Sequence, residues 1–515
     1  MEIPIYPAKK GELEEKNEYH FFLKLKQIDI RTGNSFVILI NSSDANRLGI
    51  MPGDELSLSW NGKHIELYTD ISDDLVMEGE FGLFMDIFDK YEIKNGELME
   101  LSFATRAPSI KAIYKRLKGG VLNFNETYQI IKDIVDHRLN ELEVTFFIAP
   151  SFNEKNINLD EVYYTTKSIA MLGDTFDFGP MVADKHSTGG LPGNRMTPII
   201  IPIVSSFGIC IPKTSSRSIT SPAGTADTVE TIMKVDFTTE QIKEIVNKNK
   251  ACLVWGGALK LAPADDIIIN ITRSLGIEPY SKMIISVMAK KVAMGIKYLV
   301  IDIPVAKGAK ISDMATAKKI EKLFIFLARK FDIKTKVMIS KSFGPIGRGI
   351  GPALEMRDVM RVLQQKKDRP LDLENKSLKL AGQLLEMTKV VRAGKGIEMA
   401  RTNLKNGLAF QKMIGIITSQ SGNPDIDSED IEIGKYSFEI KAKDKGIVKS
   451  INNANIVELC SLLGTPKLKG SGIYLNKNVG EKYLKGDILF TMYSESEQRL
   501  NMAKEALNNL KEIYK

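Results

Sequence analysis

Apolar and polar residues alternate in the first part of the chain. The segment FFLKLKQIDI (21–30) follows a period of two, which is typical of a half-buried β-strand. Further along, ELSLSW and KHIELY flank Asn61-Gly62, a dipeptide that favours a type I′ turn between antiparallel strands. We therefore predict that residues 1–98 form a small β barrel-like domain.

Helical spacing follows this β region. In SIKAIYKRLKGG (109–120) the apolar residues recur three and four positions apart, and a glycine pair ends the segment as a helix C-terminus commonly does. Comparable spacing continues at 125–139 and 159–172. We predict a helical lobe made of residues 102–176 and 264–297.

The rhythm changes again from Pro180. Short apolar strands, loops rich in Gly, Ser and Thr, and helical stretches follow one another, which is typical of an α/β fold with a parallel sheet. The predicted strands are 209–213, 252–255, 299–304 and 336–340. We assign residues 177–263 and 298–424 to a central α/β lobe with a mostly parallel sheet.

The last part of the chain returns to short strands with turns, before a helix expected at 496–513. Residues 425–515 are therefore predicted to form a C-terminal α+β domain. The four parts together make a multidomain α/β fold. A chain of 515 residues needs several cores, because a single core rarely grows beyond about 250–300 residues.

Charge and composition exclude some classes of protein. The 71 Lys and Arg residues against 64 Asp and Glu leave a net charge of +7, without the long basic tract of a nucleic-acid-binding protein. An anionic small substrate suits this balance. The N-terminus is polar and no apolar run is long enough to span a membrane, so we expect a cytoplasmic protein.

Cysteines and histidines give little support for a metal site. The three cysteines lie far apart and outside any CxxC motif, and the four histidines are scattered. We therefore expect neither a disulfide framework nor a bound metal. Of the four histidines, only His186 lies in a sequence context that indicates a functional site.

The stretch with the clearest candidate binding residues is DKHSTGGLPGN (184–194), which lies between a predicted strand and a helix that begins near Thr197. Glycines allow backbone N–H groups to turn toward a ligand, and the helix N-terminus adds partial positive charge. Lys185 and Ser187 add side-chain donors. Phosphate suits such a loop, although a tight turn that binds nothing is the alternative.

A second polar loop, TSSRSITSPAGT (214–225), holds six hydroxyls and one guanidinium between another strand and a helix. Open α/β sheets bind ligands at the carboxyl ends of their strands, so we expect the two loops to converge. Some of the Ser and Thr side chains are instead expected to cap turns and helix starts.

A third glycine-rich run, GPIGRGIG (344–351), lacks the GxGxxG register of a dinucleotide-binding turn and the GK[ST] ending of a P-loop. We expect this run to pack against the site or to close over it.

These motifs carry a family resemblance. KHSTGG (185–190), SSRSITSPAGTADT (215–228), WGGALKLAPADD (255–266) and SVMAKK (286–291) resemble the thymidine phosphorylase and pyrimidine-nucleoside phosphorylase family. LPGNR (191–195) and the extra N-terminal β domain resemble the long branch of that family, which includes bacterial thymidine phosphorylase-like proteins and archaeal AMP phosphorylases. The resemblance extends over nearly the whole chain.

The resemblance implies how the protein is built and what it uses. It implies a helical lobe and an α/β lobe that close over the substrate, usually in a homodimer whose contacts lie in the helical lobe. It implies that the enzyme uses no cofactor and takes inorganic phosphate as a co-substrate. Residues matching phosphate-holding positions are Lys185, Ser187, Ser215 and Thr225.

The resemblance also implies residues that contact the nucleoside or nucleotide. Arg273, Ser286 and Lys290 match the base-contacting set of thymidine phosphorylases, whereas Ser286 and Lys310 match substrate positions of the AMP phosphorylase branch. The other residues at matching substrate positions are Gly190, Ser216, Arg217, Ser218, Ile219, Thr220, Ser221 and Thr225.

Two residues are candidate proton donors to the departing base. His186 adjoins the expected phosphate site, and Glu278 stands where the AMP phosphorylase branch commonly has an aspartate. The glutamate moves the carboxyl group by one methylene. Both candidates remain open.

Three functions follow. The first is phosphorolysis of a pyrimidine nucleoside, in which thymidine and phosphate give thymine and 2-deoxyribose 1-phosphate. An alternative is a phosphorylase of AMP or other nucleoside monophosphates that yields ribose 1,5-bisphosphate, with Arg217 and Lys310 as candidates for the 5′-phosphate. A different class, binding of nucleic acid or a partner through the N-terminal β domain, has little support because that domain shows no basic stripe.

Overall fold

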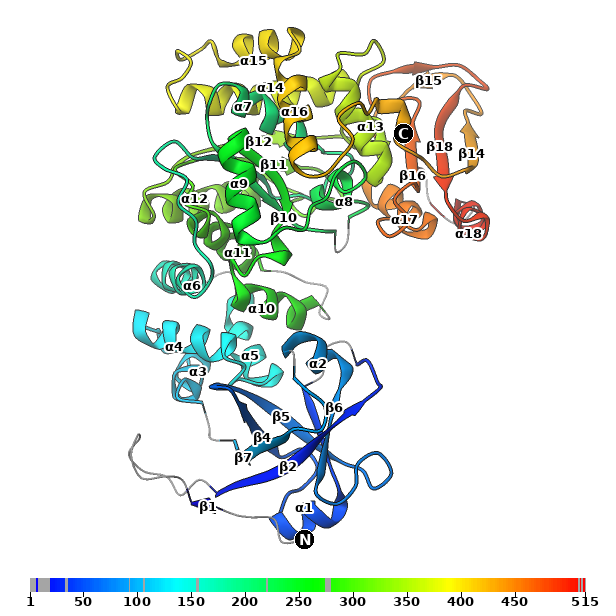
Figure 1. The fold of residues 1–515 in the computed structure, drawn as a ribbon. Coiled ribbons are helices and arrows are strands. Elements are labelled where there is room, and N and C mark those ends of the chain that lie inside the picture. Colours follow the sequence, from blue (N-terminus) through cyan, green and yellow to red (C-terminus); the bar gives the residue numbers. More distant parts are fainter. Residues whose placement is uncertain are drawn as a thin grey trace. The chain divides into compact units, whose positions relative to one another are not determined.

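The chain divides into two compact units, Met1–Leu172 with Pro263–Pro279, and Gly173–Ala262 with Tyr280–Lys515. The computed structural model (Figure 1) describes residues 6–7, 19–32, 36–91, 93–104, 107–153, 157–218, 221–273, 279–507, 510 and 513–514. A multidomain α/β fold is confirmed, and the finer four-domain boundaries stay a prediction.

The first unit opens with a closed β barrel. Six strands follow one another around it in the order β2 (Tyr19–Ile28), β6 (Glu80–Phe84), β3 (Val37–Ile40), β5 (Lys63–Ile71), β4 (Glu55–Trp60) and β7 (Leu98–Phe103), and β7 pairs back with β2. The pairs β2–β6 and β3–β5 are parallel, and the other pairs are antiparallel. The short strand β1 (Tyr6–Pro7) adds to β2, and helices α1 (Ser42–Leu48) and α2 (Met85–Tyr91) lie between strands.

The alternating pattern accounts for the barrel core. Phe21, Leu23 and Leu25 are buried, whereas Lys24 between them is exposed. Asn61 and Gly62 connect β4 to β5 with φ of 46° and 74°, as the type I′ turn requires. The predicted hairpin is confirmed.

The described helical segments that follow the barrel in the first unit are α3 (Ile110–Leu117), α4 (Phe124–Val135), α5 (Glu141–Ile148), η1 (Ala149–Phe152), α6 (Leu159–Met171) and α10 (Pro263–Arg273). Asn123 and Asn140 start α4 and α5 with reciprocal capping boxes to Glu126 and Glu143. Helix α4 ends several residues earlier than predicted, where His137 takes a left-handed φ of 54°.

A parallel sheet lies at the centre of the second unit. Its strands are β8 (Ala183–Ser187), β9 (Ile211–Ser215), β10 (Ala251–Trp255), β11 (Tyr298–Val305) and β12 (Lys334–Lys341). The strands pair in parallel as β12–β11–β8 and β9–β10, and a parallel bridge between Val182 and Cys210 joins the two sets. The predicted parallel sheet is confirmed. One difference is that β8 continues through Ser187, because Ser187 pairs with Asp302 of β11.

Helices cover both faces of this sheet (Figure 1). Helices α7 (Thr197–Ser206), α14 (Leu371–Met387) and α16 (Leu408–Ser419) pack together on one face, and α11 (Tyr280–Ala293) packs with α12 (Met314–Lys330) on the other. The isoleucine run of α7 is completely buried, since Ile199, Ile200 and Ile201 each have 0% exposure. The remaining helices here are α8 (Thr225–Val229), α9 (Thr239–Asn249), η2 (Gly256–Ala258), α13 (Pro352–Leu363) and α15 (Gly396–Lys405).

The end of the chain forms antiparallel strands and two helices. The strands are β13 (Gly349–Ile350), β14 (Tyr436–Lys441), β15 (Gly446–Ile447), β16 (Gly472–Leu475), β17 (Lys482–Tyr483) and β18 (Ile488–Ser494), and the helices are α17 (Asn453–Leu463) and α18 (Glu497–Leu507). One sheet has the order β13–β16–β18–β14. Its first strand comes from the glycine-rich run before α13, so this run links the α/β core to the C-terminal sheet.

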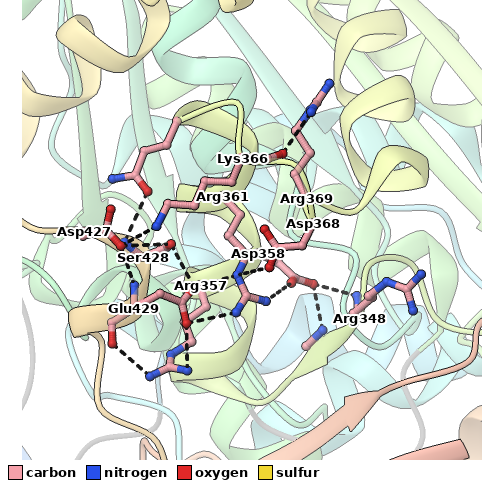
Figure 2. A network of polar contacts seen from close by, with 12 residues as sticks. Arg348, Arg357, Asp358, Arg361, Lys366, Asp368, Arg369, Asp427, Ser428 and Glu429 are labelled. Carbon is pink, nitrogen blue, oxygen red and sulfur yellow. Dashed lines mark hydrogen bonds and ion pairs between the residues drawn. The ribbon is translucent and has the colours of Figure 1, made fainter.

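A polar network fixes the same junction (Figure 2). Arg361 of α13 donates two hydrogen bonds to Glu429, which belongs to the short helix η3 (Ser428–Asp430), and Arg357 donates to the Ile431 carbonyl. The buried Asp358 accepts hydrogen bonds from the backbone N–H groups of Arg348 and Gly349 at 2.6 and 2.7 Å. The network therefore holds the glycine-rich run in place. No helix among the described residues is long and apolar enough to cross a membrane.

Candidate active site

The site begins with a buried charge cluster at β8. Asp184 is 1% exposed, and its carboxylate pairs with Nζ of Lys213 at 3.1 Å and Nζ of Lys291 at 2.5 Å. Burial alone would raise the pKa of Asp184, but the two ammonium groups outweigh this effect and lower it. Asp184 thus stays ionised and ties β8 to β9 and α11.

Lys185 has a buried ammonium group with no partner among the residues that the structure describes. Its side chain is among the largest fully buried ones, yet no hydrogen bond or ion pair joins its ammonium to another described residue. Burial lowers the pKa of Lys185 to about 8, a shift that Asp302 opposes and that Lys376 and Arg195 reinforce. Buried charges are normally paired, so this ammonium is suited to an anionic ligand.

Asp302 of β11 organises the residues that follow Lys185. Its Oδ2 accepts hydrogen bonds from Ser187 Oγ at 2.9 Å and Asn194 Nδ2 at 3.4 Å, and its carbonyl oxygen accepts from the N–H of Thr188 at 3.0 Å. Lys376 of α14 pairs with the other carboxylate oxygen at 3.2 Å. Strand β11 thereby holds the first loop at the carboxyl end of the sheet.

Several buried polar atoms in and near this loop have no hydrogen-bond partner within the described parts of the chain. They are Thr188 Oγ1, Asn194 Oδ1 and Ser215 Oγ. Buried polar atoms in proteins are rarely left unpaired, and such groups commonly mark a place for water, an ion or a ligand. Together with the ammonium of Lys185 they form the candidate phosphate cradle, since each is a polar group at the carboxyl end of the sheet that could contact an oxyanion.

Close backbone approach explains the glycines of the first loop. Gly190 has a φ of 82°, and a Cβ there would collide with the backbone nitrogen of Lys310. Gly193 has a φ of 68°, and a Cβ there would collide with the carbonyl oxygen of Ile346. The glycine-rich run therefore packs against the first loop, and two predicted substrate residues, Gly190 and Lys310, lie next to each other.

The second loop is folded by its own hydrogen bonds. Asp227 accepts from the backbone N–H groups of Ser218 and Gly224 at 2.7 and 2.8 Å, and the Ser218 hydroxyl contacts Ser221. These hydroxyls serve the turn, as the capping alternative expects for some of the residues. The Ser215 hydroxyl differs, because it is buried without a partner.

Arg217 already has partners in this structure. Its guanidinium donates two hydrogen bonds of 2.6 Å to Glu230 and lies over the Trp255 ring at 4.8 Å. Glu230 also pairs with Lys469 from the segment before β16. A substrate phosphate would therefore compete with Glu230 for Arg217.

Arg195 joins the two loops, although the sequence motifs did not mark it as a site residue. Its guanidinium donates to Thr225 Oγ1 at 2.8 Å, to the Ala223 carbonyl at 2.7 Å and to Glu355 at 2.6 Å. Glu355 is 1% exposed, so the pair is buried. The expected convergence of the two loops is thus seen in direct contacts.

His186 lies in a strongly cationic place. Burial lowers its pKa well below the usual 6.5, and the charges of Lys291, Lys213, Lys185 and Lys310 lower it further. The imidazole is therefore neutral near pH 7. A neutral imidazole still has one N–H that can donate a hydrogen bond, but it is a much weaker acid than the charged imidazolium.

The remaining predicted residues lie partly outside the described structure. Ser286 and Lys290 are one turn apart on α11, and the neighbouring Lys291 anchors that helix to Asp184. Predicted residues beyond the description are Ile219, Thr220, Glu278 and the side chain of Arg273. Among the described residues, no group of three or more His, Cys, Asp or Glu could hold a metal ion.

Comparison with known proteins identifies the family. The chain is 41% identical to the AMP phosphorylase of Methanocaldococcus jannaschii over 94% of its own length and 95% of that protein. It is 42% identical to the AMP phosphorylase of Pyrococcus furiosus over 93% of its length and 95% of that protein. The chain belongs to the thymidine and AMP phosphorylase family. It is accordingly a pentosyltransferase, as the sequence predicted.

A family profile agrees with this membership, and a solved structure shares the fold. Residues 179–410 match the family profile described as glycosyl transferase family, a/b domain, and this range contains both polar loops. The fold resembles the anthranilate phosphoribosyltransferase of Thermus thermophilus, with a TM-score of 0.51 and 13% identity over 60% of this chain and 99% of that one. This similarity concerns the fold alone.

Sequence reasoning missed several residues of the cradle. Asn194 and Arg195 belong to the LPGNR motif, but the sequence assigned no function to either residue. Asp302 lies near the carboxyl end of a predicted strand, where a site residue is expected. No sequence motif surrounds Lys376. It lies on α14, far along the chain from Asp302, and only the fold brings the two residues together.

Proposed function

We propose that the protein is a nucleoside-monophosphate phosphorylase that cleaves AMP with inorganic phosphate and gives adenine and ribose 1,5-bisphosphate. The observation that carries this proposal is the unpartnered, buried ammonium of Lys185 among the unpaired polar atoms of Thr188, Asn194 and Ser215. The relatives are named AMP phosphorylases, so they favour this alternative over the thymidine reaction that the sequence put first.

The chemistry needs an anion held beside C1′ of the ribose. The phosphate oxygen forms a bond to C1′ while the bond from C1′ to the base nitrogen breaks, and the base takes up a proton. Phosphate is itself the nucleophile, so the protein contributes position and electrostatic stabilisation. Lys185, Ser187, Ser215 and Thr225 are the proposed phosphate ligands.

The 5′-phosphate needs donors of its own. We assign it to the part of the site formed by Gly190 and Lys310, which are in contact. Arg217 is a second candidate, on condition that the substrate displaces Glu230 from its guanidinium. Roles for Ser286, Lys290 and Arg273 beside the base remain proposals carried by the family resemblance.

Release of free base tests the proposal. The full-length protein is incubated with AMP, CMP, UMP, thymidine or uridine, each with and without millimolar phosphate and without added metal. We expect phosphate-dependent release from AMP and little from thymidine or uridine. Cleavage restricted to nucleosides would contradict the proposed substrate, and cleavage independent of phosphate would contradict phosphorolysis.

A further inference from the structure

A lysine outside every sequence motif reaches the phosphate cradle. Nζ of Lys376, on α14, lies 3.2 Å from Oδ1 of Asp302. This Nζ atom is shielded from solvent and donates no hydrogen bond to a residue that the structure describes. Burying an ammonium for a single charge contact is costly, so the pair is weak evidence for stability and better evidence for a role.

Asp302 explains what Lys376 could do. The Asp302 carboxylate is 1% exposed, and its second oxygen holds Ser187 at 2.9 Å. Without a counter-ion, this buried carboxylate would repel an incoming phosphate and attract the ammonium of Lys185, which it already influences. Lys376 cancels the negative charge on the side of Asp302 that faces α14.

We propose that Lys376 is a positioning residue of the phosphate site, which neutralises and holds Asp302 so that Lys185 stays available to phosphate and Ser187 keeps its orientation. This inference rests on the proposed function, because phosphate is taken as the ligand. Lys376 acts through Asp302 and needs no contact with substrate.

The electrostatics of Lys185 supply a distinctive signature. The charged groups around it are Asp184 on β8, Lys213 on β9, Asp302 on β11, Arg195 directly after the first loop and Lys376 on α14, with His186 as its neighbour. Lys376 lowers the pKa of Lys185, and Asp302 raises it. Removing the charge of Lys376 therefore raises the pKa of Lys185, even though phosphate binding weakens. A merely structural defect would not move this pKa upward.

The test compares three substitutions in the full-length enzyme: Lys376→Met, Lys376→Arg and, as matched control, Lys379→Met, which changes an exposed lysine of the same helix. For Lys376→Met we expect KM for phosphate to rise about tenfold or more, equivalent to a loss of about 1.4 kcal/mol or more in binding. KM for AMP should change little, and the alkaline limb of kcat/KM for phosphate should move to higher pH. Lys376→Arg should restore most of the affinity, and Lys379→Met should resemble the unsubstituted enzyme.

A double substitution covers the case in which Lys376→Met does not fold. Replacing both partners in Lys376→Met/Asp302→Asn removes the buried charges together, which proteins tolerate better than removing one. If Lys376 acts through Asp302, the loss caused by Lys376→Met should be smaller on the Asp302→Asn background.

The inference is overturned if folded Lys376→Met keeps the phosphate KM and pH profile of Lys379→Met, or if KM for phosphate and for AMP rise together without a pH shift. Calorimetric measurement of phosphate binding distinguishes a failure of the Lys376 proposal from a failure of the proposed reaction. An unsubstituted enzyme that binds phosphate but cleaves no nucleotide refutes the reaction, and the variants then test the cradle through the phosphate Kd. An enzyme that binds no phosphate refutes both.

Discussion

Arg195 donates a hydrogen bond from Nη1 to the hydroxyl oxygen of Thr225 at 2.8 Å. Because this oxygen accepts from Arg195, the hydroxyl hydrogen of Thr225 is directed elsewhere and is available to a phosphate oxygen. The same guanidinium donates to the buried Glu355. Burial raises the pKa of this carboxyl, and the charge of Arg195 opposes that shift in part. One ion pair therefore sets the geometry of both loops.

Replacing Arg195 should damage stability and phosphate binding together. Arg195→Met leaves Glu355 buried without its counter-ion, which is expected to cost about 3–5 kcal/mol in the free energy of unfolding. It also releases Thr225, so KM for phosphate should rise. Chemical denaturation and steady-state kinetics measure the two effects.

The double variant Arg195→Met/Glu355→Gln separates these effects. Without a buried charge it should regain much of the stability, but its KM for phosphate should stay high because Thr225 is still not oriented. Recovery of both properties would show that Arg195 serves stability alone.

Two neighbouring glycines provide a matched pair of substitutions. Gly189 and Gly190 have φ of 80° and 82°, but only a Cβ at Gly190 meets another residue, the backbone of Lys310. Each alanine pays backbone strain of about 1–2 kcal/mol. Gly190→Ala should in addition displace Lys310 and raise KM for AMP strongly, whereas Gly189→Ala should lose stability with a smaller change in KM. Equal KM values in the two variants would refute a substrate role for the contact.

Phosphate affinity should fall at alkaline pH. The pKa of Lys185 is lowered to about 8, so its ammonium is charged below that pH and loses its proton as pH rises through it. The phosphate Kd should therefore increase above about pH 8, approaching tenfold per pH unit. In Lys185→Arg this rise should be absent, because a guanidinium stays charged across the range. Calorimetric titration from about pH 7 to pH 10 measures the phosphate Kd in both proteins. An identical rise in both would show that a group other than Lys185 causes the pH dependence.

The two candidate proton donors are distinguished by substitution. Burial and neighbouring lysines hold the pKa of His186 well below its usual range, so the reaction needs either a shift that charges this imidazole or a proton from Glu278. Glu278→Gln should reduce kcat for AMP by about 10²–10⁴-fold, the range for loss of a general acid. His186→Gln should reduce kcat by less. The opposite ranking would show that bound phosphate raises the pKa of His186 enough to make it the acid.

Local patterns predicted the elements that depend on local chemistry. The alternation around Phe21, the Asn61-Gly62 turn and the helix at Ile110–Leu117 all follow from side-chain period and backbone preference. The parallel sheet could be predicted because short apolar strands alternate with helices. The end of β8 was misplaced, since its last residues are polar and are held in the strand by pairing with β11.

The cradle was only half predictable. Lys185, Ser187 and Ser215 stand in glycine- and hydroxyl-rich loops, which are recognisable in the sequence. Asp302 and Lys376 are brought to these loops by the packing of β11 and α14, and no short-range pattern encodes that encounter. The partner of Arg217 was missed for the same reason, because Glu230 follows the loop at a distance that only the folded turn closes.

The fate of inorganic phosphate tests phosphorolysis of AMP most directly. Full-length protein is incubated with AMP and inorganic phosphate, and phosphorus NMR monitors the products alongside the release of adenine. We predict a new sugar with two phosphate groups, formed in equal amount to adenine, and loss of this reaction in Lys185→Met. Adenine released without consumption of phosphate, or equal rates in Lys185→Met, would contradict it.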